Sequence, residues 1–200
     1  MSNKVNIPEE FILKNVILKK TDDSILGKRL AVLHENTVHL AEFMPGLNLD
    51  YSIENEKSYI DYCKLNWDLG KIYDFSMFDK EGQEYLGSIR IAVTSSSRGH
   101  YEFGYWITEK YQGRGYVSEA VNALSDFLLN NLNAFRVMIQ TNLENSKSAN
   151  LALRNEFLLE HKSYNSCKEK DLFCFVKLKS KSNMKELSAK QEQLKEIFNF

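Results

Sequence analysis

The chain has 200 residues, of which 43% are hydrophobic and 26% are charged, and its formal net charge is −1. This length suits one domain, or one domain with an appendage, that can bury a substantial core without disulfides. The balanced charge excludes a protein that binds nucleic acid through a strongly basic surface. The three cysteines are scattered and form no CxxC pair, so we expect reduced thiols and no metal site.

No apolar run in the sequence approaches the length that spans a bilayer, and the N-terminal MSNKVNIPEEF has no uninterrupted apolar stretch. We therefore expect a cytoplasmic protein that does not act at a membrane.

In the first third of the chain, the patterns that predict secondary structure differ in strength. Residues 10–20, EFILKNVILKK, favour a strand, and residues 29–44 carry apolar residues at imperfect helical spacing until Pro45 and Gly46 end the pattern. Ser52 is a typical helix cap, and the acidic residues that follow it favour a helix over residues 53–69.

The spacing of the apolar residues changes at Lys71. Two segments with strand-like composition follow, residues 71–78 and 85–93, and they predict an antiparallel pair of strands around the turn DKEGQ. In residues 100–108, HYEFGYWIT, four apolar residues occupy every second position, which predicts another strand. Apolar residues from Val117 onward then follow the clearest helical spacing in the chain, and they predict a helix that ends at about Asn131.

The remaining segments predict a strand (135–142), a short helix (146–157) and a closing pair of strands (158–164 and 171–178). This order predicts an α/β domain of layered α+β type around one mixed sheet, covering residues 1–179. The lysine- and glutamate-rich residues 180–200 predict a C-terminal helical extension.

The stretch KYQGRGYVSEA, residues 110–120, places Gly113 and Gly115 between the alternating strand and the periodic helix. Glycine there permits positive φ and keeps side chains away from a ligand, while the first amides of a helix are unpaired and partly positive. The pattern favours a phosphate site, and a turn that needs glycine for its shape alone is the alternative. No Walker A loop is present, Ser118 replaces the third glycine of a dinucleotide fingerprint, and an RNA-recognition motif would require a strand here.

Gln112-Gly113-Arg114-Gly115-Tyr116-Val117 resembles the Q/RxxGxG/A pyrophosphate loop of the GNAT N-acetyltransferases, with Val117 in place of the usual small residue. The preceding EFGYW resembles the RimJ/RimL-type branch, which includes ribosomal-protein alanine and serine acetyltransferases. Two further segments resemble the same branch: Asn145-Ser146-Lys147-Ser148 with Phe157 downstream, and HENTVHLAEFMPGL upstream. Glu156 stands where that branch has glycine before Phe157.

The resemblance implies the GNAT fold, a mixed and mostly antiparallel sheet of about seven strands with a splay between strands four and five. It also implies acetyl-CoA as co-substrate. The loop amides would bind the pyrophosphate, and the backbone of Tyr105, Trp106 and Ile107 would pair with the pantetheine arm. Asn145 would contact CoA or cap its helix.

For catalysis, the resemblance suggests Glu102 as the base, directly or through water, with a surface carboxylate as the alternative. Ser148 would donate to the leaving thiolate or to an ordered water, unless it only caps the short helix. Many family members carry a tyrosine acid where this chain has Ala152. Asp50, Glu54, Glu56 and Asp61 could attract a cationic acceptor, or could simply stabilise a helix start.

The leading hypothesis is an acetyl-CoA-dependent N-acetyltransferase, acting on the N-terminal α-amine of a protein. A small-molecule amine as acceptor and a non-catalytic acyl-CoA-binding module are the alternatives. We expect no direct nucleic-acid partner, and a monomer or homodimer.

Overall fold

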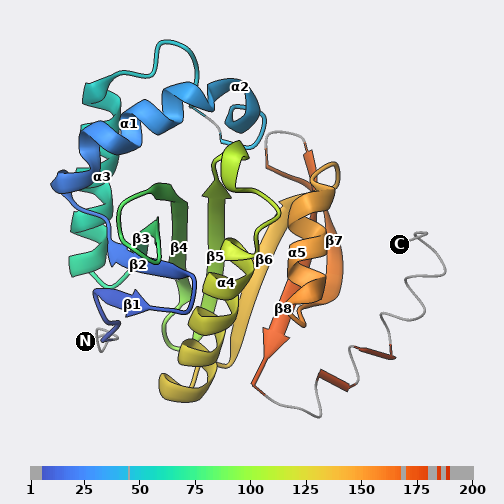
Figure 1. Ribbon diagram of the computed structural model, residues 1–200. Helices are drawn as coiled ribbons and strands as arrows, with labels where there is room; N and C mark the ends of the chain where they lie inside the picture. Colours follow the sequence, from blue (N-terminus) through green and yellow to red (C-terminus); the bar gives the residue numbers. More distant parts are fainter. Residues whose placement is uncertain (1–5, 45, 168–169, 180–183, 186–187, 190–200) are drawn as a thin grey trace. The chain divides into compact units, whose positions relative to one another are not determined.

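The computed structural model describes residues 6–44, 46–167, 170–179, 184–185 and 188–189 (Figure 1). Its contacts form two compact units. The first unit contains Asn3–Ala92 and Tyr105–Ala120, and the second contains Val93–Gly104 and Val121–Phe200. Eight strands follow the order β1-β2-β3-β4-β5-β6-β8-β7. Strand β5, His100–Ile107, belongs to both units, because the division falls after Gly104.

The first unit begins with an antiparallel ladder, in which each strand pairs with the next. Its strands are β1 (Glu10–Ile12), β2 (Val16–Lys20), β3 (Ile72–Asp79) and β4 (Tyr85–Ser95) up to Ala92. The single strand expected over residues 10–20 is therefore wrong: the chain reverses after Ile12, and Leu13 N–H donates to Val16 carbonyl at 3.0 Å.

The helices of the first unit are α1 (Leu26–Glu35), α2 (Thr37–Leu40) and α3 (Ile53–Asp68). The expected helix over 29–44 begins earlier and is interrupted at Asn36, whose side chain accepts a hydrogen bond from the Glu109 amide at 3.0 Å. Helix α3 confirms the predicted cap, because Ser52 and Asn55 exchange side chain-to-backbone bonds in a capping box.

Helix α3 packs on β3 through aromatic side chains. The ring of Trp67 meets the rings of Tyr73 and Phe75 edge-on, with centroids 5.0 and 5.1 Å apart. All three residues are buried, so this contact is part of the core of the first unit.

The second unit contains the one parallel pair described here, between β5 and β6 (Arg136–Asn142). It runs from the pair His100↔Arg136 to the pair Phe103↔Ile139. Antiparallel pairing continues through β8 (Lys170–Leu178) to β7 (Leu158–Cys167). The mixed, mostly antiparallel sheet is thus confirmed, and the 10–20 hairpin explains why eight strands replace about seven.

Helix α4 (Tyr116–Asp126) starts in the first unit and continues into a π-helical segment, Phe127–Asn131, in the second. Helix α5 (Ser146–Arg154) packs against β6, β7 and β8. Phe157 is buried just after α5 and contacts Phe103 of β5, with ring centroids 6.5 Å apart.

The C-terminal extension predicted for residues 180–200 lies largely outside the described residues, and residues 184–185 and 188–189 are helical. Among the described residues, no helix combines the length and apolar character that crossing a membrane requires.

Candidate functional site

Both glycines of the loop before α4 have left-handed backbone conformations, as the sequence predicts. Gly113 has φ 74° and Gly115 has φ 85°. A Cβ at either position would meet no heavy atom within 4 Å. The glycines are therefore required by the backbone path and not by crowding within the protein, and the space in front of them is open.

The loop also presents a row of unpaired amides. Within the part of the chain that the structure describes, no carbonyl accepts a hydrogen bond from the backbone N–H groups of residues 113–117. The first bond of the following helix is donated by Glu119 N–H to the Gly115 carbonyl at 2.9 Å. Several amides beside a helix N-terminus form a site that suits an anion, and they fit a diphosphate.

Side chains of the first unit hold this loop from two directions. Gln112 Nε2 lies 2.5 Å from His39 Nε2 of α2. On the other side, Asn15 in the β1–β2 turn donates its backbone and side-chain N–H groups to the two Glu119 oxygens, at 3.0 and 2.9 Å. Sequence reasoning missed His39 and Asn15, because neither lies near the loop in the chain.

Arg114 keeps its cationic group beside the loop. Its guanidinium carbon lies 5.3 Å from the centroid of the Tyr111 ring, and the residue is exposed. The arrangement suits a cation–π contact that leaves donors available to an anionic ligand.

The strand segment before the loop, Tyr105–Ile107, presents its backbone in two directions. A Cβ on Gly87 of β4 would lie 2.2 Å from the Trp106 carbonyl oxygen, and Thr108 N–H donates to the Leu86 carbonyl at 2.9 Å. Trp106 and Thr108 therefore direct backbone groups toward β4. Since successive residues of a strand direct these groups to opposite edges, those of Tyr105 and Ile107 point away from β4.

This geometry divides the three residues that the sequence grouped together. Tyr105 and Ile107 have the orientation needed to pair with an extended ligand. The Trp106 carbonyl faces β4, so we assign Trp106 a different role below.

Glu102 lies in the second unit, on the β5 face opposite two buried aromatic residues, Tyr101 and Phe103. It is partly exposed. Burial, followed by the negative charges of Glu160 and Glu102, raises the pKa of the nearby Cys174 thiol to about 11. Glu102 thus lies within electrostatic reach of the Cys174 thiol, and its role as a base stays a prediction.

Asn145 caps α5, because its side-chain oxygen accepts a hydrogen bond from the Ser148 backbone N–H at 3.0 Å. The capping alternative for Ser148 is therefore wrong: Ser148 is the third residue of the helix and the cap is Asn145. Ser148 is partly buried. Ala152, one turn later, is fully buried and packs into the core, so the position of the usual tyrosine offers no acid.

Glu156 takes over the backbone role of the missing glycine. It has φ 63°, Phe157 N–H donates to the Ala152 carbonyl at 3.0 Å, and Glu156 N–H donates to the Leu153 carbonyl at 3.1 Å. These two bonds form a Schellman motif, in which the left-handed position usually belongs to glycine. The departure from the family pattern therefore leaves the local fold intact.

Glu160, His161 and Cys174 gather their potential ligand atoms within 4.8 Å of one another. The Arg136 guanidinium, however, donates to Glu160 through Nη2 at 2.6 Å, so a cation already occupies the carboxylate. We assign this group to an ion pair and not to a metal centre.

Two of the four acids expected to attract a cationic acceptor form ion pairs. Glu56 is fully buried and pairs with Arg29, while Asp61 pairs with Lys57 at 2.5 Å. Asp50 and Glu54 are exposed. The expectation is therefore wrong for Glu56, whose burial in a polar cluster the sequence did not reveal.

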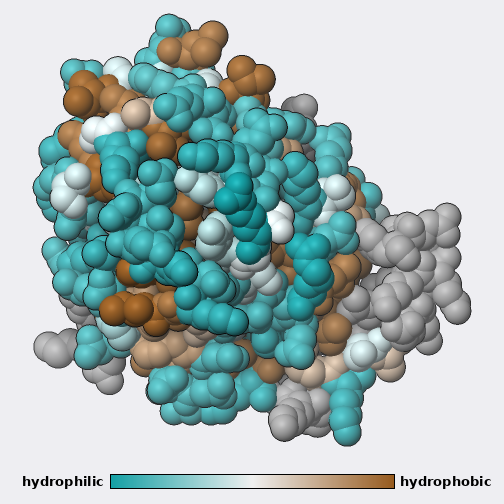
Figure 2. Space-filling model, in the orientation of Figure 1, coloured by the Kyte–Doolittle hydropathy of each residue, from teal (hydrophilic) through white to brown (hydrophobic). Residues whose placement is uncertain are grey.

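Exposed apolar side chains occur in the segment between α1 and α3, where Val38 and Leu49 are 89% and 83% exposed. Hydrophobic surface gathers at the top of Figure 2, over the region where Figure 1 draws α1, α2 and the following loop. Such surface often contacts a macromolecule.

The predicted residues thus fall into two groups. The first unit holds Tyr105–Ile107 and Gln112–Val117, and the second holds Glu102, Asn145 and Ser148.

Comparison with protein families matches residues 22–158 to the acetyltransferase (GNAT) domain. The ribosomal-protein-serine acetyltransferase of Escherichia coli (strain K12) is 39% identical over 86 residues, which are 43% of this chain and 47% of that protein. The uncharacterized N-acetyltransferase p20 of Bacillus licheniformis is 30% identical over 116 residues, 55% of this chain and 64% of that protein. The chain thus matches between about half and two thirds of the length of these curated relatives.

A solved structure of RimL, the ribosomal L7/L12 α-N-protein acetyltransferase in complex with coenzyme A, superposes with a TM-score of 0.77. The alignment covers 84% of this chain and 96% of that chain at 19% identity. At this identity the likeness establishes the fold, and it confirms the fold that the sequence motifs predict.

Proposed function

Because this chain belongs to the GNAT acetyltransferase family, we propose that it transfers the acetyl group of acetyl-CoA to the N-terminal α-amine of a protein. The observation that carries the proposal is the row of unpaired amides at residues 113–117, beside two left-handed glycines and the start of α4. These groups match a diphosphate in charge and in hydrogen-bonding character.

The residues of the first unit bind the donor. The amides from Gly113 to Val117 hold the pyrophosphate, with Gln112 and Arg114 adding side-chain donors. Tyr105 and Ile107 direct their backbone groups away from β4, and these groups pair with the amide-containing pantetheine arm as a neighbouring strand would.

The residues of the second unit perform the chemistry. Glu102 accepts the proton of the acceptor ammonium, directly or through water, because only the neutral amine is nucleophilic. The amine nitrogen then forms a bond to the thioester carbon while the carbon–sulfur bond breaks, and the second proton that the nitrogen loses passes to the departing thiolate. Ser148 donates a hydrogen bond to the departing thiolate, and Asn145 holds the start of α5 and contacts CoA.

A protein acceptor is supported by the exposed apolar residues between α1 and α3, represented by Val38 and Leu49. A peptide that follows its N-terminal amine can bury such surface, whereas a small amine cannot. The E. coli relative that acts on a ribosomal protein supports the same acceptor class.

The test measures thiol release from acetyl-CoA with N-terminal peptides and with small amines, for the wild type and Glu102→Gln. We expect turnover with peptides, and a loss of roughly 10²-fold or more in kcat for the variant. CoA affinity should stay unchanged in Glu102→Gln. Turnover with small amines alone would overturn the proposed acceptor, and CoA binding without any turnover would indicate a binding module.

A further inference from the structure

Trp106 is held by a cation on one side and by an aromatic ring on another. The Arg29 guanidinium carbon lies 5.4 Å from the Trp106 ring centroid. The Tyr85 ring approaches at 5.8 Å in an edge-on arrangement. Trp106 also packs against the apolar cluster around Ile60 and Tyr85 and against the cluster around Leu33 and Leu47. Its indole therefore has little freedom to move.

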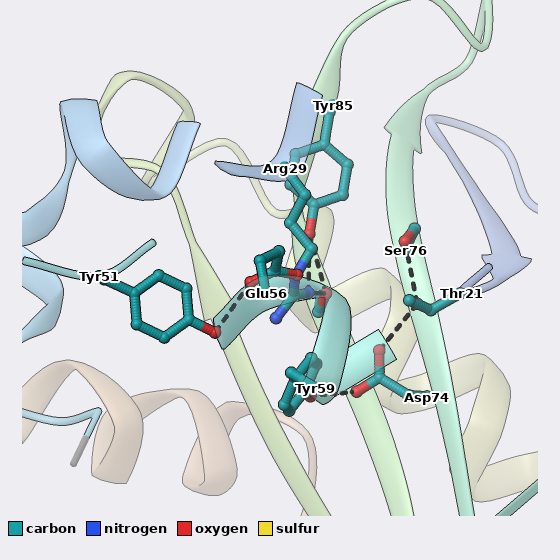
Figure 3. Close-up of polar contacts among 9 residues, drawn as sticks. Thr21, Arg29, Tyr51, Glu56, Tyr59, Asp74, Ser76 and Tyr85 are labelled. Carbon is teal, nitrogen blue, oxygen red and sulfur yellow. Dashed lines mark hydrogen bonds and ion pairs between the residues drawn. The ribbon is translucent and has the colours of Figure 1, made fainter. Parts of the chain in front are cut away.

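Arg29 of α1 is itself fixed by bonds to two other elements, α3 and β4 (Figure 3). Its Nε donates to Glu56 of α3 at 2.5 Å, and its Nη1 donates to two hydroxyls of β4, Tyr85 at 3.0 Å and Ser88 at 2.5 Å. The guanidinium also lies over the Tyr59 ring, 4.6 Å from its centroid. With 1% of its surface exposed, Arg29 is a completely buried cation.

Burying this cation is costly, and packing alone does not require it. Burial by itself would lower the pKa of Arg29, but the surrounding phenols and carboxylates raise it well above its ordinary value, so the side chain stays charged. A buried ion pair adds little stability compared with apolar residues of the same volume. The buried cation contacts the Trp106 ring. An apolar side chain at this position could pack against the indole but could not form a cation–π contact with it.

The backbone of Trp106 is restrained as well. Gly87 leaves just enough room for the Trp106 carbonyl, because a Cβ there would come within 2.2 Å of its oxygen. The middle residue of Tyr105–Ile107 is thus held by its side chain and by its carbonyl. The backbone groups of the two flanking residues point to the other edge of the strand.

We propose that Arg29 is a positioning residue, which acts through the indole of Trp106 to hold the strand segment that binds the pantetheine arm. The inference rests on the proposed function and deepens it. It separates two parts of donor binding: the loop at residues 112–117 holds the diphosphate, and the Arg29–Trp106 contact aligns Tyr105 and Ile107 with the arm.

The test compares two ligands by calorimetry, coenzyme A and adenosine 3′-phosphate 5′-diphosphate, which is coenzyme A without pantetheine. The test variant is Arg29→Met/Glu56→Leu, which removes both charges together and leaves neither one buried alone. The control is Tyr59→Phe, which keeps the ring beneath Arg29 and removes the hydroxyl that donates to Asp74 at 2.9 Å.

We expect the double variant to bind coenzyme A about tenfold more weakly, the equivalent of one lost cation–π contact of about 1.4 kcal/mol. Its affinity for the shorter ligand should be unchanged, which a general loss of structure could not produce. Tyr59→Phe should bind both ligands as the wild type does. Equal affinity of the double variant and the wild type for coenzyme A would overturn the proposal, as would an equal loss for both ligands.

Trp106 fluorescence gives a second readout. Since Trp67 and Trp106 are the two tryptophans of the chain, Trp67→Phe isolates the Trp106 signal. In that background, Arg29→Met/Glu56→Leu should increase quenching of Trp106 by acrylamide, and Tyr59→Phe should not. Unchanged quenching in the folded double variant would contradict a role that acts through Trp106. A wild type that binds neither ligand would instead refute the proposed function.

Discussion

The Nε atom of Arg29 lies 2.5 Å from the Glu56 carboxylate, and their side chains are 2% and 0% exposed. Removing one partner leaves the other charge buried without compensation. We expect Glu56→Leu to lower the free energy of unfolding by about 3–5 kcal/mol, measured by urea denaturation.

The double variant Arg29→Met/Glu56→Leu should recover most of that loss, since it removes both charges and retains apolar volume. If Glu56→Leu and the double variant were equally unstable, the ion pair would not be the source of the effect.

Glu156 adopts a left-handed conformation, φ 63°, that costs a non-glycine residue roughly 1–2 kcal/mol. Glu156→Gly should therefore raise the free energy of unfolding by about 1 kcal/mol, because its ion pair with Lys177, at 3.6 Å, is largely exposed on the Glu156 side and contributes little. Thermal and urea unfolding of the two proteins would measure the gain. Glu156→Ala is the control, which removes the carboxylate and keeps the strain.

Asn145 is assigned two roles, and two substitutions separate them. Asn145→Ala removes the cap of α5 and should cost about 1 kcal/mol of stability. Asn145→Asp keeps a good cap but adds a negative charge, so it should weaken CoA binding while preserving stability. Unchanged CoA affinity in Asn145→Asp would limit Asn145 to capping.

His100 makes folding stability depend on pH. Burial, then the positive charges of Arg136 and Arg98, lowers its pKa below the ordinary 6.5, although Glu160 opposes the shift. The unfolded chain therefore takes up this proton at higher pH than the folded protein does. The stability linked to His100 is complete above pH 6.5 and declines as the pH falls from 6.5 toward the folded pKa.

The contribution of His100 can be measured from the urea midpoints of the wild type and His100→Gln at several pH values between 7.5 and 5.5. The wild type should lose more stability than the variant over this interval. Parallel pH profiles would show that His100 does not carry the effect.

The features that could be predicted from sequence are those with local causes. Ser52 caps α3 through a bond to Asn55, three residues away, and the positive φ of Gly113 and Gly115 follows from their place between a strand and a helix. Alternation and helical spacing are likewise short-range patterns, so the sequence predicts α4 and the strands from Ile72 onward.

The features that were missed have long-range causes. The helix break at Asn36 coincides with a bond to Glu109, and the reversal near Asn15 coincides with bonds to Glu119. The Arg29 cluster depends on residues of α1, α3 and β4 meeting in one place, which no spacing in the chain encodes. Glu56 consequently resembled an ordinary acid in a first helical turn.

The central claim is that the loop amides bind a diphosphate, and calorimetry of Gly115→Val with coenzyme A tests it most directly. The control is Gly82→Val, since Gly82 also has a left-handed φ, 71°, but lies in the turn between β3 and β4. We predict that Gly115→Val loses roughly 100-fold in affinity, the equivalent of about two charge-assisted hydrogen bonds, while Gly82→Val binds as the wild type does. Unchanged coenzyme A affinity in folded Gly115→Val would contradict the account.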